Sequence, residues 1–285
     1  MTKIAIMADT DASLPDDLAQ QLGIYTVPIS IHFGQDTYDS GVNIDDTALF
    51  ERIDREGHLP TTSAPTPGKF SQAYRRALDD GADAIICFCV STEVSATHQS
   101  AVVAAQDYPD VDITVVDTLQ ISMPQGYMAI AAAEAAQAGA STEEILAAAD
   151  SIGKRTDLYA ALSTVKYLAM GGRLTGLAAG MATMLSIKPI LTVRDGKLDL
   201  LEKIRTTKKA RARVIELTKA SLGGATPEKM TIVNVAAHEA AEAFREQLRE
   251  SLPCPDEILI TDLSPGLSVH SGSGMVGVAF VKPEA

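Results

Sequence analysis

The feature that most constrains the fold is an alternation of apolar runs and helical segments through the first half of the chain. Four runs have the length and composition of buried strands, at residues 3–9, 26–33, 83–90 and 112–117. Helical patterns separate them, and an alanine-rich helical region extends from about residue 123 to 152. Strands that alternate with helices form a parallel sheet covered on both faces. The pattern therefore predicts an α/β domain over residues 1–152.

The second half of the chain mixes hairpin and helix signals. Asp195 and Gly196 separate the apolar segments 187–193 and 197–205, and an Asp-Gly pair in that setting is a strong hairpin signal. Two helical segments follow, each succeeded by short apolar runs. This pattern predicts an α+β domain with a mixed sheet over residues 153–285.

Composition and charge limit the partners of the protein. A formal net charge of −13 over 285 residues argues against non-specific binding to nucleic acid and against docking on an anionic membrane. No uncharged apolar stretch reaches the roughly 20 residues of a membrane span, and the start of the chain lacks a signal-peptide pattern. The three cysteines do not form a disulfide framework, and Cys87 and Cys89 read as core residues on one strand face. These features favour the cytoplasm.

Four loop segments gather hydroxyl groups or glycines beside the start of a regular element. They are DTDASLP at 9–15, PTTSAPTPGKF at 60–70, CVSTEVSATHQSA at 89–101 and SVHSGSGMVG at 268–277. Turn and capping chemistry explains any one of them. Together they favour an anion or carboxylate site, because ligands of open α/β sheets bind at the carboxyl ends of strands and free amides at helix starts attract anions.

The usual catalytic motifs are absent from the sequence. It has no glycine-rich phosphate loop, no nucleophile elbow and no metal-ligand spacing among its five histidines. Two enzyme alternatives stay open at this point. Ser95 and His270 would serve as nucleophile and base of an acyl-transfer or hydrolytic enzyme, and the same loops would suit a phosphate-binding sugar or nucleotide enzyme.

Five stretches, in register over nearly the whole chain, resemble the DegV family of bacterial fatty-acid-binding proteins. PTTSAPTPGKF is similar to the family's TTSQPSPGEF, and VSATHQSA to LSGTYQSA. DTLQISMPQG resembles the family's DS-x-x-x-S-x-G-x-G stretch, YLAMGGRL with SIKPIL resembles its GGRI and KPIL pair, and VHSGSGMVG resembles HTGPGAVG. Four residues depart from this pattern and alter the loop shape and polarity that it implies: Ala96, His98, Pro124 and Ser273.

The resemblance implies an α/β domain followed by an α+β domain, with a long-chain fatty acid held between them and no cofactor or metal. It implies that Thr62, with Ser63 beside it, and Ser95 hold the fatty-acid carboxylate, with His270 nearby. On this interpretation the protein is a lipid-binding protein rather than an enzyme.

The resemblance also implies a partner protein. In some bacteria such proteins present the fatty acid to a separate kinase, which makes an acyl phosphate. Arg173, the arginine of the GGRI-like stretch, is implicated in that partnership, and Arg205 is a second candidate. For the basic segment that follows Arg205, a solvated helix face is an equally good explanation.

Overall fold

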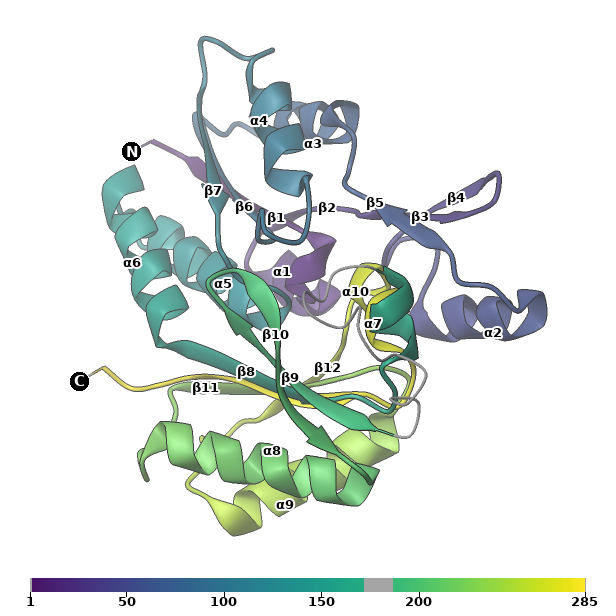
Figure 1. The fold of residues 1–285 in the computed structure, drawn as a ribbon. Coiled ribbons are helices and arrows are strands. Elements are labelled where there is room, and N and C mark those ends of the chain that lie inside the picture. Colours follow the sequence, from purple (N-terminus) through teal and green to yellow (C-terminus); the bar gives the residue numbers. More distant parts are fainter. Residues whose placement is uncertain (1, 172–186, 285) are drawn as a thin grey trace. The chain divides into compact units, whose positions relative to one another are not determined.

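The computed structural model describes residues 2–171 and 187–284, and their contacts divide the chain into two compact units (Figure 1). The first unit comprises Met1–Ile44 and Thr61–Lys154, and the second comprises Asp45–Pro60 and Arg155–Ala285. The sequence analysis placed residues 45–60 in the first domain. In the structure they group with the second unit, where helix α2 (Asp46–Glu56) contacts α10 (Pro265–Ser271).

A sheet of four parallel strands, in the order β2-β1-β6-β7, forms the centre of the first unit. Its strands are β1 (Ile4–Asp9), β2 (Tyr25–Val27), β6 (Ala84–Cys89) and β7 (Asp112–Asp117). Strand β6 is buried along its whole length, as its continuous apolar run predicts for a central parallel strand. Cys87 and Cys89 lie on one face of this strand with their sulfur atoms 3.9 Å apart, in agreement with the prediction.

Helices cover this sheet on both faces (Figure 1). They are α1 (Asp16–Gln21), α3 (Pro67–Asp79), α4 (Thr97–Ala105), α5 (Met123–Gln137) and α6 (Thr142–Arg155). Phe70 and Tyr74 of α3 pack with Ala101 of α4 on one side of the sheet, whereas α5 contacts β1 and β6 from the other side. The alanine-rich region is thus two helices, and Gly139, at a φ of 81°, lies between them.

Residues 26–33, predicted as a single strand, belong to two different sheets. Strand β2 ends at Val27, and β3 (Ser30–Phe33) forms a three-stranded antiparallel sheet in the order β4-β3-β5. The other two strands are β4 (Asp36–Asp39) and β5 (Thr61–Ser63), the latter expected to be a loop. Pro28 lies at the break, and proline has no N–H to donate to a sheet ladder.

The second unit is built on a mixed six-stranded sheet in the order β10-β9-β8-β13-β11-β12. Its strands are β8 (Thr156–Ala161), β9 (Lys188–Arg194), β10 (Lys197–Ile204), β11 (Lys229–Asn234), β12 (Leu259–Asp262) and β13 (Val276–Val281). Strands β9 and β10 form the hairpin predicted at Asp195 and Gly196. Helices α8 (Thr207–Leu222) and α9 (His238–Ser251) bury Val214 and Phe244 against this sheet, together with Phe280 of β13.

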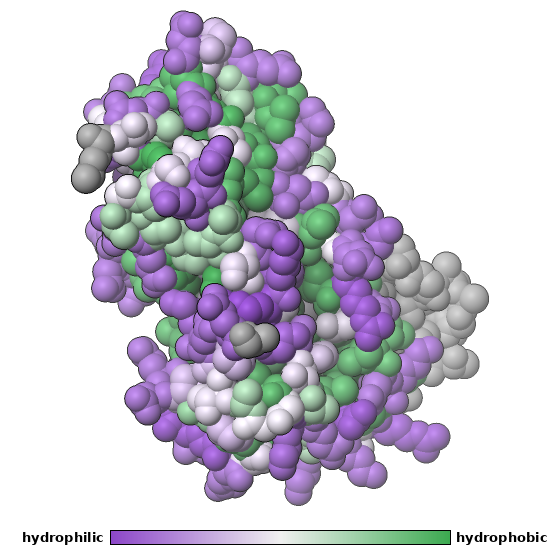
Figure 2. All heavy atoms as spheres, turned by 90° about the vertical axis from the view of Figure 1, so that its left-hand side faces the viewer, coloured by the Kyte–Doolittle hydropathy of each residue, from purple (hydrophilic) through white to green (hydrophobic). Residues whose placement is uncertain are grey.

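The predicted fold class is confirmed: a parallel α/β domain precedes an α+β domain with a mixed sheet. In the described ranges, no helix combines the length and the apolar character that a membrane crossing needs. Hydrophilic residues cover much of the face shown in Figure 2, with smaller hydrophobic areas between them.

Candidate functional site

The carboxyl edge of the parallel sheet is organised around Asp9, the last residue of β1. Its side chain is fully buried. One oxygen, Oδ1, accepts a hydrogen bond from the backbone N–H of Asp11 at 3.0 Å, and Oδ2 accepts from the N–H of Val90 at 2.7 Å and from Nε2 of Gln125 at 3.1 Å. Burial raises the pKa of Asp9 to about 6, and the three donors limit that rise. Asp9 therefore ties together the turn after β1, the loop after β6 and the first turn of α5.

The loop that follows β6 carries Ser95, one of the predicted carboxylate ligands. Its backbone N–H donates to the carbonyl of Ser91 at 3.1 Å, and the N–H of Ser91 donates to the carbonyl of Gln120 at 3.0 Å. The Ser95 hydroxyl is half-buried at the start of α4, 2.8 Å from Oγ1 of Thr97 and 3.3 Å from its N–H. Ser95 thus stabilises the first turn of α4, where Ala96 offers no side-chain cap.

The turn between β7 and α5 is strained at Ser122. This buried residue has φ 63° and ψ −148°, a region that side-chain-bearing residues rarely adopt. Its N–H donates to the carbonyl of Asp11 at 2.9 Å, which fixes the turn. Gly126 follows, and a Cβ atom there would lie 2.9 Å from the carbonyl oxygen of Ala12. The glycine is required because α5 approaches the β1 loop this closely.

Sequence reasoning did not single out Asp9, Ser122 or Gln125 as individual site residues. Gln125 is completely buried, and its Oε1 has no hydrogen-bond partner among the described residues. One local signal was available, since an acid that ends a buried apolar strand must find donors in the fold.

Thr62 and Ser63 are neighbours on β5, so their side chains point to opposite faces of the small sheet. Thr62 pairs with the fully buried Ile31 of β3, and Ser63 pairs with Ser30. The Ser63 hydroxyl lies 2.8 Å from Nε2 of His32, whose Nδ1 lies 3.0 Å from Oγ1 of Thr37. The two predicted ligands therefore lie on opposite faces of this small sheet.

His270 lies on α10, in a stretch that the sequence analysis assigned to a loop segment. The helix spans Pro265–Ser271 and ends at Gly272, whose N–H donates to the carbonyl of Ser268 at 2.8 Å. The Ser268 hydroxyl donates to Oδ2 of Asp46 at 3.0 Å, which links α10 to the start of α2. His270 is half-buried in the last turn of this helix.

Asp46 makes the second unit sensitive to pH. Burial raises the pKa of this carboxyl to about 7; the Ser268 hydrogen bond opposes the rise, and the charges of Asp262 and Asp45 add to it. Between the ordinary aspartate pKa and pH 7 the native state holds a proton that the unfolded chain has released, so stability falls as pH rises through that window. We expect Asp46→Asn to be more stable than the wild type at pH 8 by about 1–3 kcal/mol, and to lose this advantage at pH 4.

Urea unfolding of both proteins at the two pH values measures this difference. Asp54→Asn, an exposed position in the same helix, is the matched control and should show no such dependence. An advantage of equal size at both pH values would contradict the titration of Asp46.

Arg205 follows β10 directly and is exposed, and it makes no ion pair with any described residue. Arg173 lies outside the described residues. In residues 2–171 and 187–284, no three histidine, cysteine, aspartate or glutamate side chains are grouped so that they could hold a metal ion.

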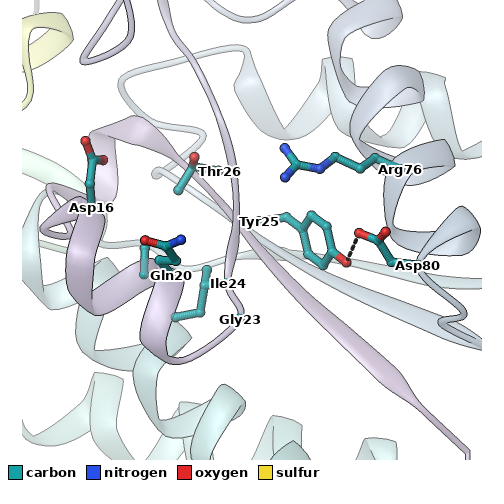
Figure 3. Close-up of a pocket in the computed structure, with 9 residues that line it drawn as sticks. Asp16, Gln20, Gly23, Ile24, Tyr25, Thr26, Arg76 and Asp80 are labelled. Carbon is teal, nitrogen blue, oxygen red and sulfur yellow. Dashed lines mark hydrogen bonds between the residues drawn. The ribbon is translucent and has the colours of Figure 1, made fainter.

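A hollow of about 440 Å³ lies beside edge strand β2 in the first unit (Figure 3). Asp16 and Gln20 of α1, Tyr25 and Thr26 of β2, and Arg76 of α3 are among its lining residues. The Tyr25 hydroxyl donates to Oδ2 of Asp80 at 2.7 Å, and the Arg76 guanidinium stands 5.7 Å from the centre of the tyrosine ring. Acidic, basic and uncharged polar side chains line this hollow. None of the predicted carboxylate ligands is among its lining residues.

A parallel α/β unit with a polar carboxyl edge, joined to an α+β unit with a mixed six-stranded sheet, defines a two-domain class of α/β proteins. The chain belongs to the DegV family, since the family model described as "Uncharacterised protein, DegV family" matches residues 3–283. A DegV domain-containing protein of Streptomyces coelicolor is 35% identical over 275 residues, which cover 96% of this chain and 97% of the relative. The resemblance seen in the sequence motifs is thereby confirmed.

Solved structures of DegV proteins share this fold. A DegV family protein from Thermus thermophilus, described as binding fatty acid, is 31% identical with a TM-score of 0.89, and the match covers 99% of this chain and 100% of that one. DegV from Bacillus subtilis, described as a fatty acid binding protein, is 27% identical, also with a TM-score of 0.89 and coverage of 99% and 100%.

Proposed function

We propose that this protein binds a long-chain fatty acid between its two domains. The observation that carries the proposal is the similarity, over the full length of both chains, to DegV structures described as fatty-acid-binding. The proposed carboxylate ligands are Thr62 and Ser95, with His270 nearby and Ser63 next to Thr62 on β5. The lack of a catalytic motif in the sequence supports a binding protein of the cytoplasm rather than an enzyme.

The energetics of such a ligand favour this arrangement. Each buried methylene contributes about 0.8 kcal/mol, so a tail of roughly fifteen contributes on the order of 12 kcal/mol before the costs of ordering it. A hydrogen bond to a charged carboxylate adds only about 1.5–3 kcal/mol. The tail therefore supplies most of the affinity, while hydroxyl groups at the head determine which end of the ligand faces outward.

The direct test is to denature the purified protein, extract it with solvent and identify the released lipid by mass spectrometry. We expect a long-chain fatty acid in near-stoichiometric amount. A lipid-free protein that also takes up no added fatty acid would rule the proposal out. Turnover of acyl esters that Ser95→Ala abolishes would instead support an acyl-transfer or hydrolytic enzyme.

The ligand roles of Ser95 and Thr62 can be separated from their structural roles. Ser95→Ala and Thr62→Val should each weaken fatty-acid binding by roughly 10- to 100-fold, the loss of one hydrogen bond to a charged acceptor. Ser100→Ala on α4, the helix that follows Ser95, and Thr61→Val on β5, the strand of Thr62, are the controls, and neither should change the affinity. Unchanged affinity in a folded Ser95→Ala protein would remove Ser95 from the site, and circular dichroism checks the fold.

We further propose that the protein presents its fatty acid to a separate kinase, which forms an acyl phosphate. Arg205 is exposed and makes no ion pair with a described residue, which supports a role for this region in docking, and Arg173 is proposed from the family resemblance. Arg173→Ala should leave bound fatty acid nearly unchanged and lower acyl phosphate formation by a cognate kinase. Lipid content and ATP consumption, with and without that kinase, are the paired readouts, and ATP turnover by this chain alone would contradict the presentation role.

A further inference from the structure

Two cations of the second unit are linked to the same small loop, one directly and one through Ser163. Arg211 of α8 brings Nη2 to within 3.5 Å of the carbonyl oxygen of Gly274, a long contact. Nζ of Lys188, the first residue of β9, donates to the carbonyl of Ser163 at 2.5 Å. The Ser163 hydroxyl donates in turn to the carbonyl of Ser273. Arg211 therefore contacts the loop formed by Ser273 and Gly274, which we call the 273–274 loop, and Lys188 is linked to this loop through Ser163.

The register of the six-stranded sheet explains why they converge. The end of β10 lies beside the start of β9, because Ile204 pairs with Lys188. The end of β8 lies beside the start of β13, because Ala161 pairs with Val276, and Ala161 also pairs with Ile190 of β9. All these strand ends, and the beginning of α8, share one edge of the sheet. His270 precedes the 273–274 loop by three residues and belongs to the same connection.

Neither cation has a carboxylate partner within the part of the chain that the structure describes. Arg211 is half-buried, and its Nε is buried without a hydrogen-bond partner. Burial lowers the pKa of its guanidinium, with no neighbouring acid to offset the effect. Two positions along the same helix, Arg213 binds Glu202 with both Nε and Nη2 and binds Glu216 at 2.7 Å.

This absence of acids is costly and needs an explanation. A cation removed from water without a counter-ion destabilises the folded state, and the chain carries 37 acidic residues against 24 basic ones. Ser163 offers Lys188 a neutral carbonyl group, and Gly274 offers one to Arg211. Partly buried cations without a counter-ion mark a candidate functional site, and an anionic ligand would supply the missing charge.

We propose that Lys188 and Arg211 form an anion subsite on the 273–274 loop that binds a phosphoryl group. The proposal rests on the function proposed above, in which an acyl phosphate forms at the head of the fatty acid. Two uncompensated positive charges match a phosphoryl dianion better than the single charge of a carboxylate. The planar guanidinium offers paired donors to phosphate oxygens, and the lysine adds a point charge. Ser273 is exposed, so the loop is open to solvent.

Inorganic phosphate is the probe, titrated into the full-length protein by calorimetry and followed by thermal unfolding. Sodium chloride of equal ionic strength is the reference, because exposed charges bind anions weakly and without specificity. We expect phosphate to raise the Tm of the wild type above the chloride value. Arg211→Met and Lys188→Met should each weaken phosphate binding by roughly tenfold or more, the loss of one charge-assisted hydrogen bond. Lys208→Met, an exposed position on the same helix, should bind phosphate like the wild type.

A second expectation separates a ligand site from a merely structural cation. Without phosphate, Arg211→Met should have a higher Tm than the wild type, because it removes a buried charge that lacks a counter-ion. If either methionine variant fails to fold, Arg211→Lys is the alternative. It keeps the positive charge but loses the paired donors of the guanidinium, so it should lose less phosphate affinity than Arg211→Met is expected to lose. Wild-type affinity in the folded Arg211 and Lys188 variants would overturn the proposal.

The source of the phosphoryl group is tested by competition. Acetyl phosphate, a minimal acyl phosphate, should displace inorganic phosphate from the wild type, and failure to do so would overturn the link to acyl phosphate. Extracted fatty acid should be unchanged in both methionine variants. Loss of the lipid with normal phosphate binding would assign these cations to the carboxylate and overturn the subsite. Phosphate binding and lipid content are measured separately, so the subsite and the fatty-acid proposal can fail separately.

Discussion

Replacing Gly272 with alanine is expected to destabilise the second unit by about 2–5 kcal/mol. Gly272 has φ 79° and ψ 159°, a conformation essentially confined to glycine that costs other residues about 1–3 kcal/mol. An added Cβ would also lie 2.3 Å from Cδ2 and 2.5 Å from Cε2 of Tyr167, and overpacking adds about 1–3 kcal/mol. The Tyr167 ring stands edge-on to Phe50 with centroids 6.2 Å apart, so it cannot move away without losing that contact.

Urea unfolding followed by circular dichroism measures this loss. Gly223→Ala, in the same unit, is the control because Gly223 has φ 59° and no atom near its added Cβ. It should lose only about 1 kcal/mol, the conformational part of the penalty. The same Gly272→Ala change in a Tyr167→Ala background should cost less, because the clash is gone. Equal losses of unfolding free energy in Gly272→Ala and Gly223→Ala would show that the clash with Tyr167 does not contribute.

Asp9→Asn should be the second most damaging substitution, with a loss of about 2–4 kcal/mol. Oδ2 of Asp9 accepts from the Val90 N–H and from Nε2 of Gln125. If the introduced asparagine keeps its side-chain oxygen toward the Asp11 N–H, its amide nitrogen takes the place of Oδ2. That nitrogen is a donor, so it faces the Val90 and Gln125 donors without accepting from them. Two buried donors then lose their acceptor, and each unsatisfied group costs about 1–3 kcal/mol. In the opposite side-chain orientation, the asparagine oxygen accepts from Val90 and Gln125, and the Asp11 N–H loses its acceptor instead.

Amide hydrogen exchange shows which part of the first unit Asp9→Asn destabilises. The Val90 amide starts the loop that carries Ser95, so exchange at Val90 and Ser95 should accelerate in Asp9→Asn more than in β7. Asp16→Asn, exposed at the start of α1, is the control and should change neither stability nor exchange. A stability within about 0.5 kcal/mol of the wild type, the usual scatter for surface changes, would mean that the amide finds other acceptors.

The buried strands were predictable because their signal is local. Strands β1, β6 and β7 agree closely with the apolar runs at 3–9, 83–90 and 112–117. The hairpin at Asp195 and Gly196 follows from turn chemistry alone, since Asp195 adopts a φ of 48° and Gly196 one of 77°. Ser13 ends a single 3-10 turn (Thr10–Ala12), and Pro15 directly precedes α1.

The amino-acid sequence by itself determined the kinds of element, the family, and the loops that carry the hydroxyl groups and His270, because periodicity and motifs are encoded within a few neighbouring residues. Only the tertiary structure decided which polar groups serve the fold. Asp9 finds its donors 81 and 116 positions away along the chain, and Thr62 and Ser63 are separated by their pairing with β3. Lys188 and Arg211 are linked to one loop because β8 and β10 end, and β9 and β13 begin, at one edge of the sheet. Partners this distant depend on strand order and register, which no local pattern encodes.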